Sequence, residues 1–165
     1  MSACVIVGVV PDQADTVVVQ AAMFAARFNA ELVCASVDAG QYHVYDLGDG
    51  TMTSFPFTAD APDPAVERFD RNLAAHLAAL LDGRGLTWST RALAGNPAQA
   101  LGDLADTLNA AMIVVGTREA TLRASLQEFI NGSVAAQLAH RQHRPVVVIP
   151  LAPVPSDQPL PWDPA

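Results

Sequence analysis

Short, almost purely apolar runs alternate along this chain with longer segments of helical periodicity, and the alternation constrains the fold more than any other feature. Four runs, at residues 3–10, 31–37, 111–115 and 146–149, are nearly continuous in Val, Ile, Leu, Cys and Ala. Runs of this kind are typical of strands buried on both faces, as in parallel sheets. Residues 86–93 alternate in part between apolar and polar, which predicts an edge strand.

Helices are predicted between these strands. The first covers residues 13–29, and its buried face is Val17, Ala21, Phe24, Ala25 and Phe28. The second begins at Asp63-Pro64, a cap followed by a first-turn proline, and runs to about Asp82, with the stripe Val66, Phe69, Leu73, Leu77 and Leu80. The third follows Gly95-Asn96-Pro97 with the stripe Leu101, Leu104, Ala105 and Leu108, and the fourth follows Gly132-Ser133.

The order of these elements predicts an α/β fold, a three-layer sandwich in which helices cover both faces of a five-stranded parallel sheet. Right-handed crossovers limit the possible topologies, and among these we expect the strand order 3-2-1-4-5. In that order the first and fourth strands lie side by side while their connections lead to opposite faces. Open α/β sheets bind ligands at such a switch point, beyond the carboxyl ends of the strands.

Two regions fall outside the alternating pattern. We expect one domain over residues 1–150, interrupted by an insert at 39–62 that is rich in glycine, proline and aromatic residues. Asp49-Gly50 within the insert fits the turn of a small hairpin, and a long ordered loop is the alternative. The tail, residues 151–165, holds five prolines and is expected to be an extended arm.

Composition narrows the classes of function. The formal net charge of −8 disfavours nucleic-acid binding, and no apolar run approaches the roughly 20 residues that cross a bilayer. The N-terminus shows no signal-peptide pattern. The two cysteines, Cys4 and Cys34, are expected to be buried thiols, and could form a disulfide only from neighbouring strands in the right register. These features together predict a cytoplasmic protein without nucleic-acid or membrane partners.

The cationic residues, all nine of them arginines, are unevenly distributed. Residues 116–144 hold four arginines and two acidic residues, a local balance of +2 on an acidic chain. A locally positive segment suits a small anion such as a phosphate. The alternative is a solvated face without a ligand.

Residues 114–150 contain the motif with the clearest chemistry. Gly116 ends the fourth apolar strand, and we expect it to let the chain turn sharply and to let a ligand approach the backbone. Gly132-Ser133 opens the next helix, whose free N–H groups and dipole favour an anion. The Ser133 hydroxyl suits a phosphate oxygen, and equally suits a simple helix cap.

These residues resemble a known family. The segments VGV near the N-terminus, AGNPAQAL before a helix, and VVGTR…NGSVAAQLAHRQHRPVVVIP are similar to the universal stress protein (UspA-like) family. The resemblance implies an adenine nucleotide alpha hydrolase-like fold and a homodimer formed through the last strand, Val146 to Ile149. It also implies a small stress-response module that binds ATP or a related adenine nucleotide, with Mg²⁺ only where ATP is bound.

The resemblance also assigns site residues. The phosphate side would be Gly116, Thr117, Gly132, Ser133 and Val134, and the base would lie against Val10, Val37 and Val115. Arg118 and Arg123 are electrostatic candidates, with solvated surface as the alternative.

The chain departs from the family pattern of ATP-binding members at three points. Glu119 stands at the middle glycine position, and the connection from Gly116 to Gly132 is three residues longer. Val10 stands where the family has an adenine-contacting Asp, and Asp12 follows two residues later. Within the longer connection, residues 121–130 have helical spacing and would make a short helix that partly fills or lids the pocket.

Three functions remain open at this point. The first is a nucleotide-binding regulatory module, the second a nucleotide-free dimer that acts through protein contacts, and the third a slow nucleotide hydrolase. No nucleophile, base and orienting residue form a legible set, so we assign no catalytic residues and do not expect a dedicated enzyme. The four histidines, His43, His76, His140 and His143, lack metal-site spacing, so we assign no metal ligands.

Overall fold

The computed structural model describes residues 3–38, 69–117, 133–151, 153 and 155–157, and the backbone of 41–45 and 52–56. The elements are β1 (Cys4–Gly8), α1 (Thr16–Arg27), β2 (Glu31–Asp38), β3 (Gln41–Tyr45), β4 (Met52–Pro56), α2 (Arg71–Leu81), β5 (Trp88–Ala94), α3 (Pro97–Leu108), β6 (Met112–Gly116), α5 (Val134–Arg141) and β7 (Val146–Ile149).

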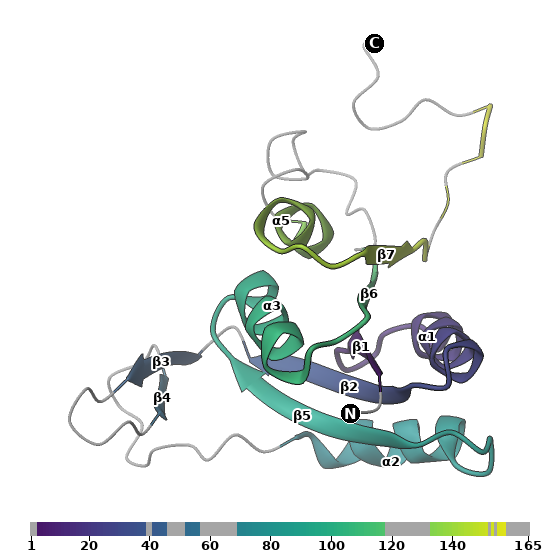
Figure 1. The fold of residues 1–165 in the computed structure, drawn as a ribbon, viewed down its shortest axis with the longest axis horizontal. Helices are drawn as coiled ribbons and strands as arrows, with labels where there is room; N and C mark the ends of the chain where they lie inside the picture. The colour runs from purple at the N-terminus through teal and green to yellow at the C-terminus, as the bar shows by residue number, and fades with distance from the viewer. Residues whose placement is uncertain are drawn as a thin grey trace.

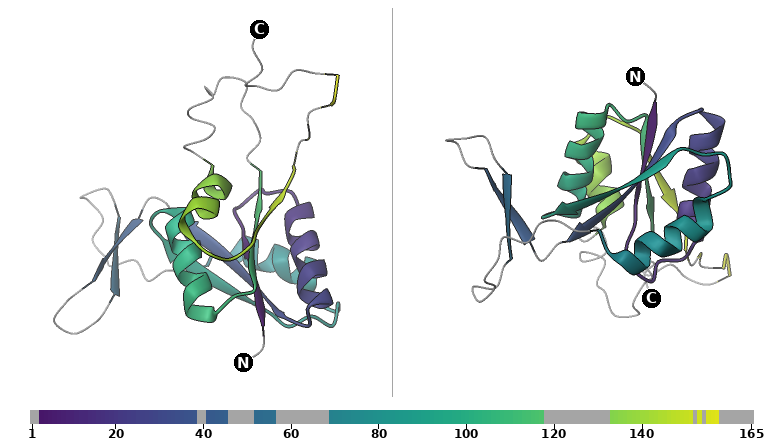
Figure 2. Two further views of the ribbon diagram at one scale, coloured as in Figure 1. Left: turned by 45° about the horizontal axis from the view of Figure 1, so that its top comes forward. Right: turned by 90° about the horizontal axis from the view of Figure 1, so that it is seen from below.

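The main sheet confirms the predicted topology. Its five strands are ordered β5-β2-β1-β6-β7, and every neighbouring pair is parallel. In chain order of these five strands this is 3-2-1-4-5. Helices α1 and α2 cover one face and α3 and α5 cover the other, so the molecule has three layers (Figures 1 and 2).

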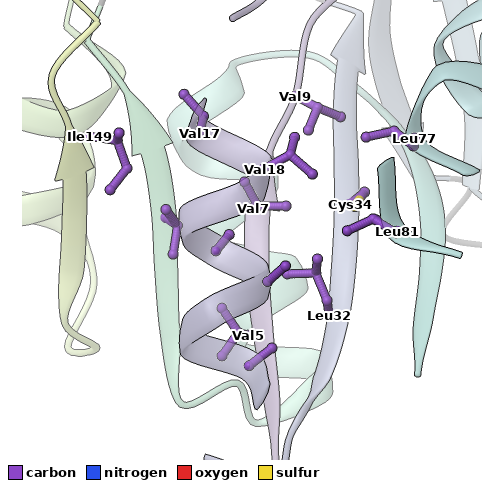
Figure 3. Close-up of a cluster of buried hydrophobic side chains, with 14 of the residues drawn as sticks. Val5, Val7, Val9, Val17, Val18, Leu32, Cys34, Leu77, Leu81 and Ile149 are labelled. Atoms are coloured by element: carbon purple, nitrogen blue, oxygen red, sulfur yellow. The ribbon is translucent and has the colours of Figure 1, made fainter. Parts of the chain in front are cut away.

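Strand pleating divides the core into two clusters. Val5 and Val7 of β1 point toward α1 and α2, whereas Ile6 points toward α3 and α5. Figure 3 shows the first cluster, in which Val17 and Val18 of α1 pack over the β1 side chains. Successive side chains of a strand point to opposite faces, so a strand buried on both faces must be apolar at every position. This explains the unbroken apolar runs of the sequence.

The first helix is shorter than predicted. It ends at Arg27, and Phe28, which we expected on its buried face, is 55% exposed. Asn29 takes a left-handed conformation (φ 49°) that redirects the chain toward β2, so Phe28 lies past the last buried turn. The first strand is shorter as well, because Val10 lies beyond β1 and is 53% exposed.

The start of the second helix was predicted wrongly. The N-cap is Asp70, whose side chain accepts a hydrogen bond from the Leu73 N–H at 2.7 Å, so Phe69 precedes the helix. The expected cap at Asp63-Pro64 and the expected core residue Val66 lie outside the described residues. Both sites carry a residue that caps well, so local sequence alone did not distinguish them.

The insert contains a hairpin, one of the two structures left open by its sequence. β3 and β4 pair antiparallel, with Tyr42 opposite Phe55 and Val44 opposite Thr53. They form a separate two-stranded sheet beside the main sandwich (Figure 1). The expected turn at Asp49-Gly50 lies outside the described residues.

The cysteines are free, and the strand register explains why. Cys4 and Cys34 lie on neighbouring strands, but Cys34 pairs with Val7, three residues beyond Cys4. At about 3.3 Å per residue this offset exceeds the reach of a disulfide. The two thiols also belong to core clusters on opposite faces. Burial raises the pKa of Cys34 to about 12 and also raises that of Cys4.

None of the helices in the described ranges is long and apolar enough to cross a bilayer.

Candidate functional site

A cleft of about 430 Å³ opens beyond the carboxyl ends of the central strands. β1 and β6 are neighbours there, and the helices that follow them, α1 and α5, cover opposite faces of the sheet. This is the predicted switch point. The lining residues are Gly8, Val9, Val10, Pro11, Asp12, Gln13, Ala14, Ala35, Val37, Pro97, Leu101, Val115, Gly116, Thr117, Val134 and Leu151.

Most of the predicted site residues meet at this cleft. Its lining includes the three proposed base contacts, Val10, Val37 and Val115, and three of the proposed phosphate contacts, Gly116, Thr117 and Val134. Ser133 immediately precedes Val134 and caps α5, but it is not among the lining residues. Gly132, Arg118, Glu119 and Arg123 lie outside the described residues, as does the predicted lid over residues 121–130.

Several lining residues were not predicted from the sequence. Residues 11–14, which connect β1 to α1, form one wall, and Pro97 and Leu101 of α3 form another. The capping signal at Asn96-Pro97 could have identified α3, because its helix must begin at the same edge of the sheet. Leu151 was assigned to the tail, and no local pattern marks it as part of a site.

Two helices begin at the cleft. The first residues of α3 and α5, Pro97 and Val134, both line it. Asn96 and Ser133 cap these helices, accepting hydrogen bonds from the N–H groups of Gln99 (3.1 Å) and Ala136 (3.4 Å). Helix N-termini carry partial positive charge, so this end of the cleft favours an anion.

Position 116 requires a glycine for a different reason from the sharp turn that we expected. It remains in β6, paired with Ile149, and its φ is not left-handed. A Cβ at this position would lie 2.9 Å from Val17 Cγ2 and 2.9 Å from Gln13 Nε2. Real Cβ atoms do not approach other atoms so closely. Gly116 therefore allows the start of α1 and the β1–α1 connection to pack against β6.

We expect Gly116→Ala to destabilise the protein by about 1–3 kcal/mol, the usual cost of overpacking a core. Val17 is fully buried and β-branched, so it cannot easily rotate away from the added methyl group. Gly8→Ala is the matched control, since its Cβ would meet nothing closer than Leu101 Cδ1 at 3.3 Å. Urea denaturation measures both, and equal losses would contradict this account of Gly116.

Thr117 links the cleft to the chain that follows β7. Its N–H donates to the Ile149 carbonyl at 2.9 Å, and its Oγ1 accepts from the Leu151 N–H at 2.9 Å. Leu151 is half-buried against the α1-side core and lines the cleft. The predicted phosphate contact thus also fixes the direction in which the tail leaves the sheet.

Part of the locally positive segment lies away from the cleft. Arg144 donates to the Ala110 carbonyl at 2.7 Å and forms an ion pair with Asp106, at the end of α3 and the start of β6. This is the opposite edge of the sheet from the cleft. Arg144 therefore stabilises the fold and does not attract an anion to the switch point.

The cleft itself has little charge of its own. Asp12 is the one charged side chain among the lining residues that the structure describes. In the described ranges, no group of three His, Cys, Asp or Glu side chains is arranged to hold a metal ion. His76 instead contacts Asp15, with Nε2 2.6 Å from Oδ1, and so connects α2 to the start of α1.

Comparison with known proteins finds one matching family and many solved structures with a similar fold. The family model described as Universal stress protein family matches residues 2–150. A universal stress protein in complex with cAMP is 23% identical, with a TM-score of 0.57 over 90% of this chain and 96% of that one. A universal stress protein from Archaeoglobus fulgidus in complex with dAMP is 18% identical, with a TM-score of 0.54 over 89% and 97% of the two chains.

A further solved structure, a protein of the same family from Burkholderia pseudomallei, is 22% identical, with a TM-score of 0.60 over 90% of this chain and 96% of that one. A comparison with curated proteins gives no match.

Proposed function

The chain belongs to the universal stress protein family, and from this premise we propose that its cleft binds an adenine nucleotide and that occupancy regulates contacts with other proteins. The observation that carries the proposal is the cleft itself, which has apolar walls at the strand ends and two helix N-termini at its rim. Its volume falls within the roughly 300–1,000 Å³ of small-molecule sites. The relatives in complex with cAMP and dAMP have the same fold.

The lining suggests how the nucleotide would lie. Val37 and Val115 offer an apolar surface for the base, as does the exposed side chain of Val10. The N-terminus of α5, at Ser133 and Val134, suits the phosphates because its dipole and free N–H groups favour an anion. With ATP, a Mg²⁺ ion would be held chiefly by the phosphates, as is common for this ion.

Analysis of the purified protein tests the proposal. Mass spectrometry of material released by denaturation should find an adenine nucleotide, and calorimetric titration of stripped protein should show binding of AMP, ADP or ATP but not of GTP. Following ATP over hours in the same samples tests for slow hydrolysis. Protein that carries no nucleotide and shows no heat with excess adenine nucleotide would leave the nucleotide-free dimer as the function.

Dimerisation through β7 is a second proposal, supported by a separate observation. β7 is the outermost strand of the described sheet, and Val148 on it is 43% exposed. An exposed apolar edge strand is suited to pairing with a second copy. We expect wild-type protein to have the molar mass of a dimer in light scattering, and Val148→Lys to have that of a monomer. A monomeric wild type would contradict the proposal.

The remaining expectations concern organisation and location. We propose that residues 1–150 form the stress protein domain, with the β3–β4 hairpin in the insert and residues 151–165 as an appended tail. The free, buried cysteines suit a reducing compartment such as the cytoplasm. Fractionation of cells that express the chain tests the location.

A further inference from the structure

Gln13 has an unpaired polar atom at the wall of the cleft. Its Oε1 is buried and has no hydrogen-bond partner among the described residues. Buried polar groups are nearly always paired, and an unpaired one costs free energy. Gln13 also lines the cleft, so a bound ligand is one partner that could relieve this cost.

The position of Gln13 is set by the backbone turn that precedes it and by its contact with β6. The preceding residue, Asp12, is held in the left-handed region (φ 62°), and the Gln13 N–H donates to the Val10 carbonyl at 3.3 Å. The amide of Gln13 packs against Gly116, since a Cβ on that glycine would lie 2.9 Å from Nε2. The side chain therefore lies beside the end of β6, at the wall of the cleft.

The other polar side chains of the lining are less suited to accept from a ligand in this way. Thr117 Oγ1 already accepts from the Leu151 N–H. Asp12 is exposed, so solvent competes for its oxygens. The last torsion of a glutamine side chain is soft, so the amide of Gln13 can rotate to present Oε1 to a ligand.

We propose that Gln13 is a specificity-determining residue whose amide oxygen accepts a hydrogen bond from a donor on the nucleoside part of the bound nucleotide. The donor is the 6-amino group of adenine or a ribose hydroxyl. A site with such an acceptor rejects analogues that lack the donor, because the acceptor then stays unpaired. This inference rests on the proposed function of the cleft.

The test is calorimetric titration of wild type, Gln13→Met and Gln13→Glu with four ligands: AMP, 2′-deoxy-AMP, 3′-deoxy-AMP and the purine riboside monophosphate that lacks the 6-amino group. Met keeps the length of the side chain without its acceptor, and Glu keeps an acceptor. We expect Gln13→Met to bind AMP about five- to hundredfold more weakly, because the ligand's donor would then be buried without a partner. In wild type and in Gln13→Glu, one analogue should bind more weakly than AMP. In Gln13→Met, the same analogue should bind as well as AMP does. The group that this analogue lacks is then the donor.

Thermal unfolding without nucleotide separates this role from a structural one. Gln13→Met removes a buried unpaired atom, so its melting temperature should equal or exceed that of wild type. A lowered melting temperature, or AMP binding within twofold of wild type, would overturn the role of Gln13 and leave the proposed function intact. Wild type that binds none of the four ligands would overturn both.

Discussion

Ser133→Asp is expected to weaken nucleotide binding strongly while leaving the stability of the protein nearly unchanged. Ser133 caps α5 through its side-chain oxygen, which accepts from the Ala136 N–H. Aspartate caps helices as well as serine does, and its charge is favourable at a helix N-terminus. The same charge would stand beside the phosphates of the proposed ligand. Two unit charges about 6 Å apart repel by about 3 kcal/mol at an effective dielectric constant of about 20.

Calorimetry with AMP should therefore show about a hundredfold loss of affinity, the equivalent of that repulsion. Adenosine, which has no phosphate, is the matched ligand and should bind wild type and Ser133→Asp equally. Raising the salt concentration should recover part of the AMP affinity, because salt screens the repulsion.

Ser133→Gly is the second control. Replacing an N-cap serine by glycine lowers protein stability by only a few tenths of a kcal/mol. Because it also removes the hydroxyl, any loss of AMP affinity in this variant measures a direct hydrogen bond from Ser133 to the ligand. Unchanged AMP affinity in Ser133→Gly would make Ser133 only a cap. Unchanged AMP affinity in Ser133→Asp would show that the phosphates do not lie at the start of α5, and would remove the pose proposed for this cleft.

The sheet architecture could be predicted from the sequence because it depends on general rules of strand burial and strand connection, and not on particular side-chain contacts. Apolar runs that are continuous, as at residues 3–10 and 111–115, must be buried on both faces, and crossovers between parallel strands are right-handed. These two constraints limit the possible strand orders, and the observed order brings the carboxyl ends of β1 and β6 together. Val37 and Val115, which the family resemblance assigned to the base, lie near strand ends at this edge and line the cleft.

The sequence could not show which contacts form across the cleft. Whether Gly116 turns the chain or receives α1 depends on the distance between two elements that are far apart in sequence. Leu151 reaches the site through its hydrogen bond to Thr117, which local patterns do not encode. Arg144 belongs to the locally positive segment from which we expected an anion site. Its guanidinium instead binds Asp106 and the Ala110 carbonyl, at the edge of the sheet opposite the cleft. The net charge of a sequence segment does not show at which edge of the sheet its charged side chains lie.

Leu138→Ala is expected to cost about 2–5 kcal/mol of stability, the range for truncating a fully buried leucine. Leu138 is fully buried, and it is the one buried residue of α5. The helix has only eight residues, and an isolated helix of that length is not stable in water. Its docking on the sheet therefore depends strongly on this side chain. Urea denaturation measures the loss, with His140→Ala, an exposed residue of the same helix, as the control at about 0.5 kcal/mol or less.

Leu138→Ala should also weaken nucleotide binding by more than the loss of folded protein alone would explain. α5 contributes Val134 to the cleft and its N-terminus to the proposed phosphate site, so loosening the helix moves both. We expect the remaining folded protein to bind AMP at least tenfold more weakly, as measured by calorimetry at a temperature where unfolding is negligible. Normal AMP affinity in folded Leu138→Ala would mean that the ligand is held by the strand ends alone. In that case the two helix N-termini would not account for anion binding, and the apolar walls would be the primary determinant of the site.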